Sequence, residues 1–214
     1  MTPGLVIALP KGKLLVTAIA ALRKIGIFSR TLTPRARRLI HSSRETGHRM
    51  MIIRAIDVPT YVEYGAADLG IVGKDVLLEQ GRDVYEPLDL GFGRCRLVVA
   101  APRNGNRGRR SPTKLRVATK YPNVTEQHFS RKGVPIEIIK LYGSVELAPA
   151  AGLCDRIVDL SSTGRTLRDN GLVELEEIAE CTARLIVNRA GLKLKHREVS
   201  EIIRKLKALG TRKR

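Results

Sequence analysis

The sequence has no tryptophan, and aromatic residues make up only 4% of its 214 residues. A core built from it must therefore be aliphatic, packed from leucine, isoleucine, valine and alanine. Acidic residues are also scarce, 21 against 39 basic ones, which gives a formal net charge of +18. This charge favours anionic partners such as nucleic acids, acidic membrane surfaces or phosphorylated small molecules.

Cysteines are few, and no apolar run is long. Cys95, Cys154 and Cys181 lie far apart without metal-ligand spacing, so we expect reduced thiols rather than a disulfide framework. Residues 1–28 are largely apolar, but Pro10-Lys-Gly-Lys13 interrupts them, which excludes a signal peptide or a membrane span there. The sequence therefore predicts a soluble, cytoplasmic protein with no membrane partner.

The positive charge is concentrated in three segments, residues 30–54, 103–110 and 205–214. The second and third have the composition of a solvated loop and of a chain end, so we interpret them as surface charge. The first overlaps expected strand and loop ends, where cations can face a ligand.

Short apolar runs alternate with helical patterns, which predicts mostly parallel α/β layers. A helix is expected to begin with Asp57 as its N-cap and end at Gly65. The pattern divides into two series, which predicts lobe I from residues 1–95 and 182–214 and lobe II from residues 96–181. A ligand cleft is expected between them. The other predicted strands and helices cover residues 5–9, 14–25, 50–53, 68–72, 75–80, 96–101, 115–118, 124–132, 136–139, 156–160, 164–168, 185–187 and 199–209.

The most informative segment is Ile157-Val-Asp-Leu-Ser-Ser-Thr-Gly-Arg-Thr-Leu167, an apolar strand followed by a turn that opens a helix. Free backbone N–H groups at a helix N-terminus bind anions, and the Thr163 and Thr166 hydroxyls add donors. Gly164 lets the backbone approach a phosphate closely. Asp159, expected where the strand ends, is suited to accept hydrogen bonds from ribose hydroxyls. We interpret the segment as a phosphoribose site; the alternative is an N-capped helix after an ordinary strand.

Other binding motifs are missing. The sequence contains neither Gly-x-x-x-x-Gly-Lys-Ser/Thr nor Gly-x-Gly-x-x-Gly, and its histidines lack metal-ligand spacing, so no protein metal site is predicted. Asp155 precedes Asp159 by four residues and shares its face of a regular strand, where it either helps to hold Mg²⁺ or faces solvent. We expect all four histidines at the surface: His41, His48, His128 and His196.

The phosphoribose motif and an upstream glutamate resemble the signature of the ATP phosphoribosyltransferase family. In this sequence the signature runs Glu146-Leu-Ala-Pro-Ala-Ala-Gly152, then Cys154, Ile157, Asp159 and Thr163-Gly-Arg-Thr-Leu167. Cys154 departs from the pattern, since the family has alanine, serine or glycine there. The resemblance extends over residues 8–14, 57–73, 89–97, 118–122 and 140–149.

The resemblance implies a two-lobed α/β fold like that of type II periplasmic binding proteins, with the active site between the lobes. It implies the short form of the enzyme, a homodimer that joins a regulatory subunit similar to histidyl-tRNA synthetase in a hetero-oligomer. The reaction would join N1 of ATP to C1 of phosphoribosyl pyrophosphate, releasing pyrophosphate, as the first step of histidine biosynthesis.

Site residues follow from the resemblance. Asp159 would bind ribose hydroxyls, and Glu146 would contact ribose or orient the turn at 143–144, unless it only caps a helix. The 5-phosphate would lie against Ser162, Thr163, Gly164, Arg165 and Thr166.

The leaving pyrophosphate and the ATP phosphates need cations, for which Lys11, Arg30 and Arg54 are the candidates; the alternative is ordinary surface charge. Mg²⁺ is expected as a cofactor because two polyphosphates meet in one site. No general base is required, because N1 of adenine carries no proton.

Three other functions compete with this interpretation. A type I phosphoribosyltransferase acting on free bases would carry two adjacent acids before the turn, but Val158 precedes Asp159. A binding protein of the same fold would lack catalysis. A nucleic-acid-binding protein fits the charge, but the charge is spread along the chain and stacking aromatics are scarce, so no nucleic-acid partner is predicted.

Overall fold

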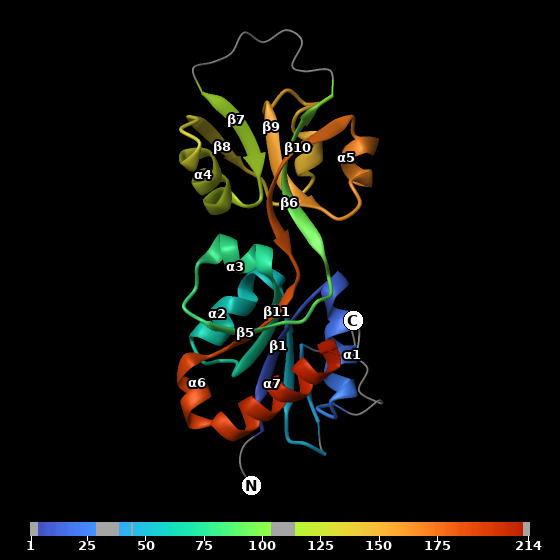
Figure 1. The fold of residues 1–214 in the computed structure, drawn as a ribbon, viewed down its shortest axis with the longest axis vertical. Coiled ribbons are helices and arrows are strands. Elements are labelled where there is room, and N and C mark those ends of the chain that lie inside the picture. Colours follow the sequence, from blue (N-terminus) through green and yellow to red (C-terminus); the bar gives the residue numbers. More distant parts are fainter. Residues whose placement is uncertain (1–3, 29–38, 44, 104–113, 212–214) are drawn as a thin grey trace. The chain divides into compact units, whose positions relative to one another are not determined.

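The structure is a computed structural model, and it describes residues 4–28, 39–43, 45–103 and 114–211. The chain divides into two compact units: unit 1 contains Met1–Gly93 and Thr182–Arg214, and unit 2 contains Arg94–Cys181. Each unit is built around one β-sheet with helices on both faces (Figure 1).

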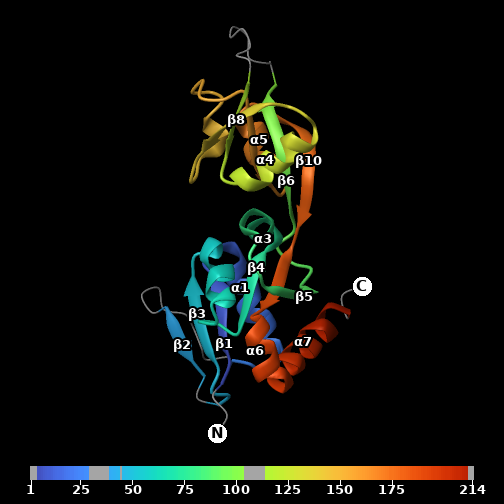
Figure 2. The ribbon, with the colours of Figure 1, turned by 90° about the vertical axis from the view of Figure 1, so that its left-hand side faces the viewer.

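The sheet of unit 1 has the strand order β2-β3-β1-β4-β11-β5 (Figure 2). Strand β1 lies parallel to β3 and β4, whereas β2, β11 and β5 run antiparallel to their neighbours. The elements are β1 (Val6–Pro10), α1 (Lys13–Lys24), β2 (Ile40–Ser42), β3 (Arg49–Ile53), η1 (Ala55–Asp57), α2 (Val58–Glu63), β4 (Leu69–Gly73), α3 (Lys74–Gln80), β5 (Tyr85–Asp89), β11 (Ala183–Val187), α6 (Arg189–Leu194) and α7 (His196–Thr211).

Alternating side chains of β1 and of Leu5, which precedes it, supply both cores of unit 1. Leu5, Ile7 and Leu9 pack with α1 and α7 on one face, and Val6 and Ala8 pack with α2 and α3 on the other. The closing helix was predicted from apolar residues spaced at three and four positions, and this face of α7 is buried.

The sheet of unit 2 has the strand order β10-β6-β9-β7-β8. Strand β7 is parallel to β8 and β9, whereas β6 is antiparallel to β9 and β10. Helix α4 packs on one face, and α5 with the short helix η2 packs on the other. The elements are β6 (Cys95–Pro102), β7 (Leu115–Thr119), α4 (Pro122–Arg131), β8 (Ile136–Lys140), η2 (Val145–Leu147), β9 (Arg156–Ser161), α5 (Arg165–Asp169) and β10 (Leu172–Cys181).

The prediction of mostly parallel sheets is wrong. Among the described strands, four neighbouring pairs are parallel and five are antiparallel. Strand β10 was missed because glutamates interrupt its apolar pattern, and two register shifts bend its pairing with β6. Asp57 is the N-cap of α2, as predicted, although its side chain makes no cap hydrogen bond.

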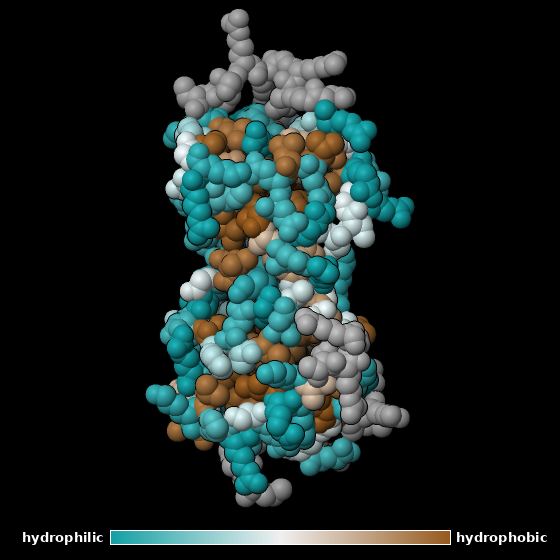
Figure 3. Space-filling view, in the orientation of Figure 1, coloured by the Kyte–Doolittle hydropathy of each residue, from teal (hydrophilic) through white to brown (hydrophobic). Residues whose placement is uncertain are grey.

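Much of the face drawn in Figure 3 is covered by hydrophilic side chains. Within the described ranges, no helix combines the length and the apolar composition needed to cross a membrane.

Candidate functional site

The carboxyl ends of three parallel strands meet at one edge of the unit 2 sheet. Because β7 pairs in parallel with both β8 and β9, the segments that follow these strands emerge side by side. In open α/β sheets, ligands bind outside this edge. Two groups of predicted substrate-binding residues lie on these segments: Glu146 after β8, and residues 162–166 after β9.

The turn at residues 162–166 has the local geometry of an anion-binding loop. Gly164 is left-handed, with φ 70°, and a Cβ there would lie 2.9 Å from Nη1 of Arg168 and 3.1 Å from Oε1 of Glu174. The N–H of Arg165 donates to Oγ1 of Thr163 at 3.4 Å. Within the described part of the chain, the N–H groups of Thr163 and Gly164 donate to no protein acceptor. The other four side chains of the turn are exposed: Ser162, Thr163, Arg165 and Thr166.

Helix α5 offers a weaker N-terminus for binding an anion than the sequence predicts. It has only five residues, so few peptide dipoles add up at its N-terminus. The donors that remain are the N–H groups of the turn and the hydroxyls of its serine and threonines.

Asp159 lies inside β9 rather than at its end, which corrects the prediction. It is the fourth of six residues, half-buried, and its Oδ1 accepts the N–H of Leu160 at 2.8 Å. Side chains alternate along a strand, so Asp159 shares its face with Ile157 and Ser161. Ile157 packs in the cluster that contains Leu167 of α5, which places the Asp159 carboxylate on the same face as the turn.

A charged network that the sequence analysis missed supports the end of β9. Oγ of Ser161 donates to Oε1 of Glu174 at 2.6 Å, and Arg96 approaches Oε2 of the same carboxylate at 2.7 Å. Hydrogen bonds to a charged group are short and strong, so these two fix the position of the Glu174 carboxylate beside Ser161. Arg96 and Glu174 come from β6 and β10, and no local pattern links them to residues 157–167.

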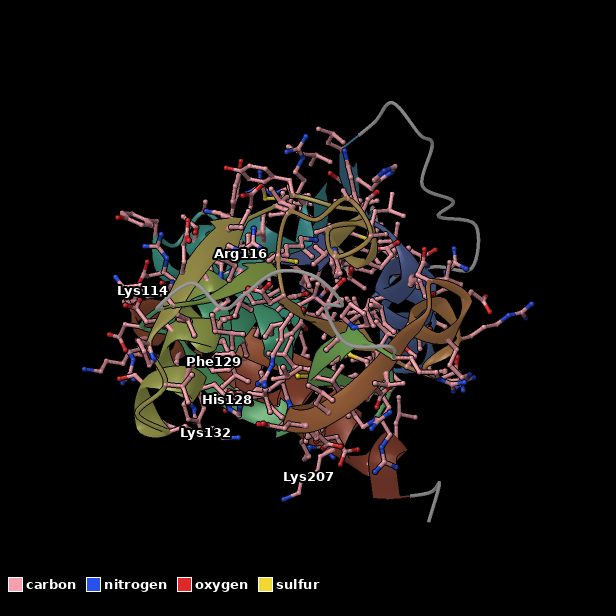
Figure 4. The ribbon with its side chains drawn as sticks, turned by 90° about the horizontal axis from the view of Figure 1, so that it is seen from above. Lys114, Arg116, His128, Phe129, Lys132 and Lys207 are labelled. Carbon is pink, nitrogen blue, oxygen red and sulfur yellow. The ribbon has the colours of Figure 1, made fainter. Side chains whose placement is uncertain are left out.

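Asp155 fits neither of the two predicted alternatives, because its carboxylate is paired with an arginine rather than facing solvent or being free to bind Mg²⁺. It forms an ion pair with Arg116 of β7, Nη2 to Oδ1 at 3.0 Å, with both side chains 18% exposed, and it accepts the Arg116 N–H at 3.0 Å. Arg116, the second residue of β7, is labelled in Figure 4. Among the residues that the structure describes, no three histidine, cysteine, aspartate or glutamate side chains form a group able to hold a metal.

Glu146 is the middle residue of η2, half-buried, on the segment between β8 and β9. Ser144 precedes η2 in the left-handed region with φ 48°, and its side chain makes no cap hydrogen bond. Helix η2 contacts β9, so Glu146 and Asp159 belong to neighbouring elements of one unit.

Two predicted cations come together in unit 1. Lys11 follows β1 and Arg54 follows β3, and these strands are parallel, with Pro10 opposite Ile53. The Lys11 N–H donates to the Ile53 carbonyl at 2.7 Å, and both Lys11 and Arg54 are exposed at this carboxyl edge. The third predicted cation, Arg30, lies outside the described residues.

Three of the four histidines are less exposed than predicted, whereas His196 is exposed. His41 is buried in β2, and Nε2 of His128 lies 2.9 Å from a carboxylate oxygen of Glu176. Figure 4 labels His128 and Phe129, which lie on α4, and Lys132, which is the C-cap of this helix. Nδ1 of His48 accepts the Leu5 N–H at 3.0 Å, and burial lowers the pKa of its imidazole.

Cys154, the position that departs from the family signature, is fully buried before β9 and packs in the cluster that contains Ile157 and Leu167. Burial raises the pKa of its thiol, so the side chain stays protonated at neutral pH and acts as a small apolar residue.

Comparison with known proteins adds independent information. The sequence model of the family "HisG: ATP phosphoribosyltransferase" matches residues 54–208. An ATP phosphoribosyltransferase of Geobacter metallireducens is 60% identical over 205 residues, which covers 95% of this chain and 97% of that protein. An ATP phosphoribosyltransferase 2 of Geobacter sulfurreducens matches with the same identity and coverage.

Solved structures agree with these matches. The ATP phosphoribosyltransferase (HisG:HisZ) complex from Thermotoga maritima contains a chain that is 37% identical, with a TM-score of 0.83, covering 97% of this chain and 99% of that one. The Escherichia coli periplasmic aliphatic sulphonate binding protein SsuA has a TM-score of 0.59 at 13% identity, covering 98% of this chain and 73% of its own. This second likeness concerns the fold alone, and it confirms the predicted resemblance to periplasmic binding proteins.

Proposed function

The chain belongs to the ATP phosphoribosyltransferase family, and from this premise we propose that the turn at residues 162–166 holds the 5-phosphate of phosphoribosyl pyrophosphate. The protein is a pentosyltransferase of the first step of histidine biosynthesis, so the predicted family, fold and activity are confirmed. In the proposed reaction, N1 of ATP attacks C1 of the phosphoribosyl group, the C1–O bond breaks and pyrophosphate leaves.

One observation carries the proposal for the phosphate. At Gly164 the backbone turns through the left-handed region, beside N–H groups that find no acceptor among the described residues, and the hydroxyls of Thr163 and Thr166 are exposed. Asp159, on the same face of β9, is suited to bind the ribose hydroxyls next to this phosphate. Glu146, from the neighbouring segment, would contact the ribose or orient its own turn.

Catalysis depends on charge that develops as the C1–O bond breaks. Positive charge grows on the ribose and negative charge on the pyrophosphate, so fixed cations near the leaving group lower the barrier. Lys11 and Arg54, adjacent at the carboxyl edge of β1 and β3, are proposed for this role. Arg30 remains the predicted third cation for the leaving pyrophosphate and the ATP phosphates. The location of the active site between the lobes stays a prediction.

Mg²⁺ is proposed to enter with the substrates. Mg²⁺ keeps much of its water and is commonly held by substrate phosphates and one or two carboxylates. No described group of three acidic, histidine or cysteine side chains offers a protein cage, so the residues present fit an ion held by the polyphosphates. When bound, such an ion neutralises charge on the phosphates.

The partner proposed for this chain is a regulatory subunit of the HisZ kind. The Thermotoga maritima structure contains HisG together with HisZ, and this complex motivates the proposal. We further propose a homodimer within that hetero-oligomer, a cytoplasmic location and no nucleic-acid partner.

The test supplies the purified chain with ATP, phosphoribosyl pyrophosphate and Mg²⁺ and follows the ultraviolet absorbance of the N1-ribosylated nucleotide. Free purine and pyrimidine bases in place of ATP should give no product. Product from a free base, or none from ATP both without and with the proposed HisZ-like subunit, would contradict the proposed reaction.

Two variants test the assigned roles. Asp159→Asn keeps the acceptor for the Leu160 N–H but loses the charge, and it should reduce kcat/KM by at least about tenfold. Arg54→Glu should reduce turnover far more than it lowers the melting temperature, because Arg54 is exposed. Normal turnover in either variant would remove that residue from the site.

A further inference from the structure

A fully buried hydroxyl lies directly beneath the carboxyl edge of the unit 2 sheet. Thr119 is the last residue of β7 and has 0% exposure. Its Oγ1 donates to the Val158 carbonyl at 2.8 Å and accepts the Tyr121 N–H at 2.9 Å. The Thr125 hydroxyl, which donates to the Tyr121 carbonyl at 2.6 Å, lies 3.3 Å away.

The Thr119 hydroxyl links β7 and β9 through hydrogen bonds at the point where the pairing of these two strands ends. Thr119 and Val158 are the last paired residues of β7 and β9. Beyond them β7 turns away, while β9 continues to Ser161 and the phosphate turn. The Thr119 hydroxyl lies between the Tyr121 N–H and the Val158 carbonyl, so it connects the first turn residues after β7 to β9.

The carbonyl that accepts this bond belongs to the same planar peptide group as the N–H of Asp159. Fixing the orientation of that peptide therefore fixes where the Asp159 side chain leaves the strand. The Asp159 carboxylate is held in turn by the Leu160 N–H at 2.8 Å.

The main chain of Thr119 reaches the third segment. The Leu141 N–H donates to the Thr119 carbonyl at 2.9 Å, at the start of the segment that leads from β8 to Glu146. Thr119 thus joins the segments that follow β7 and β8 to β9, and it is fully buried.

We infer that Thr119 is a positioning residue for phosphoribosyl transfer, which acts by holding Asp159 and the segment after β7 in register. The inference rests on the proposed role of Asp159 on the ribose. A buried side chain with this many hydrogen bonds also stabilises the fold, so the test must separate position from stability.

The experiment compares Thr119→Val, Thr119→Ser and Thr125→Val in the full chain, each assayed well below its melting temperature. Valine keeps the shape of Thr119 but removes the hydroxyl that bonds to the Val158 carbonyl and the Tyr121 N–H, whereas serine keeps this hydroxyl. Small displacements of reacting groups cost up to about 100-fold in rate, so Thr119→Val should lose about 10- to 100-fold in kcat/KM for phosphoribosyl pyrophosphate. Thr119→Ser should restore most of it.

Thr125→Val is the matched control. It also removes a buried hydroxyl from unit 2, but its main bond runs to Tyr121 rather than to β9. We expect a lowered melting temperature with nearly unchanged kinetics for phosphoribosyl pyrophosphate. Equal kinetic losses in both valine variants, or normal kinetics in Thr119→Val, would overturn the positioning role.

The same assay separates this inference from the proposed function. If the unmodified chain makes no N1-ribosylated product, either alone or with the proposed HisZ-like subunit, the proposed function fails. If it makes product and Asp159→Asn is impaired while Thr119→Val is normal, the role of Asp159 stands and the inference fails alone.

Discussion

Substitution of Gly164 by alanine tests the phosphate turn most directly. Alanine at φ 70° is forced into the left-handed region, which costs about 1–2 kcal/mol. Its Cβ would also lie 2.9 Å from Nη1 of Arg168 and 3.1 Å from Oε1 of Glu174. Glu174 is held by Ser161 and Arg96, so relief of this contact disturbs the end of β9.

A control in the same unit carries the same backbone cost. Gly171 also has φ 70°, but a Cβ there meets nothing within 4 Å. Both Gly164→Ala and Gly171→Ala should therefore lose about 1–2 kcal/mol, which corresponds to roughly 2–8 °C in melting temperature for a chain of this size. Only Gly164→Ala should disturb the turn that is proposed to hold the phosphate.

The assay is the kinetic dependence of product formation on phosphoribosyl pyrophosphate, measured below both melting temperatures. Loss of about 1.4 kcal/mol of phosphate binding corresponds to a tenfold change, so Gly164→Ala should raise KM for this substrate by about tenfold or more. Gly171→Ala should leave it near normal. Equal KM values for the two variants would refute the assignment of the turn to the 5-phosphate.

Two further predictions concern ionisable groups. Burial raises the pKa of the Cys154 thiol and Cys95 is half-buried, so a thiol reagent on the native protein should label Cys95 first, as mass spectrometry would show; faster labelling of Cys154 would contradict this. Hydrogen bonds from Lys132 and His128 lower the pKa of Glu176 below its ordinary 4.5, so the stability that they contribute is present above pH 4.5 and is lost as the pH falls through the lowered value. Glu176→Gln should therefore unfold more readily than the unmodified chain at neutral pH, with the difference shrinking in acid; a difference independent of pH would contradict the shift.

Local sequence determined much of the secondary structure and the main motif. Apolar runs such as Leu5–Leu9 form buried strands in an aliphatic core, and the spacing of Val199, Ile202 and Leu206 specifies the buried face of α7. The order strand, Gly164 turn and helix was predicted because glycine and the flanking small residues act within a few positions of one another. These features depend on neighbours in the chain, which a pattern can record.

The tertiary structure alone decided which distant residues meet. Lys11 and Arg54 are adjacent because β1 and β3 are parallel, and Asp155 pairs with Arg116 because β7 lies beside β9. Periodicity shows which face of a strand is apolar, but it does not show the direction or identity of the neighbouring strand. For the same reason the sequence did not reveal that the Thr119 hydroxyl reaches the Val158 carbonyl, since that contact exists only once two separate strands have paired in register.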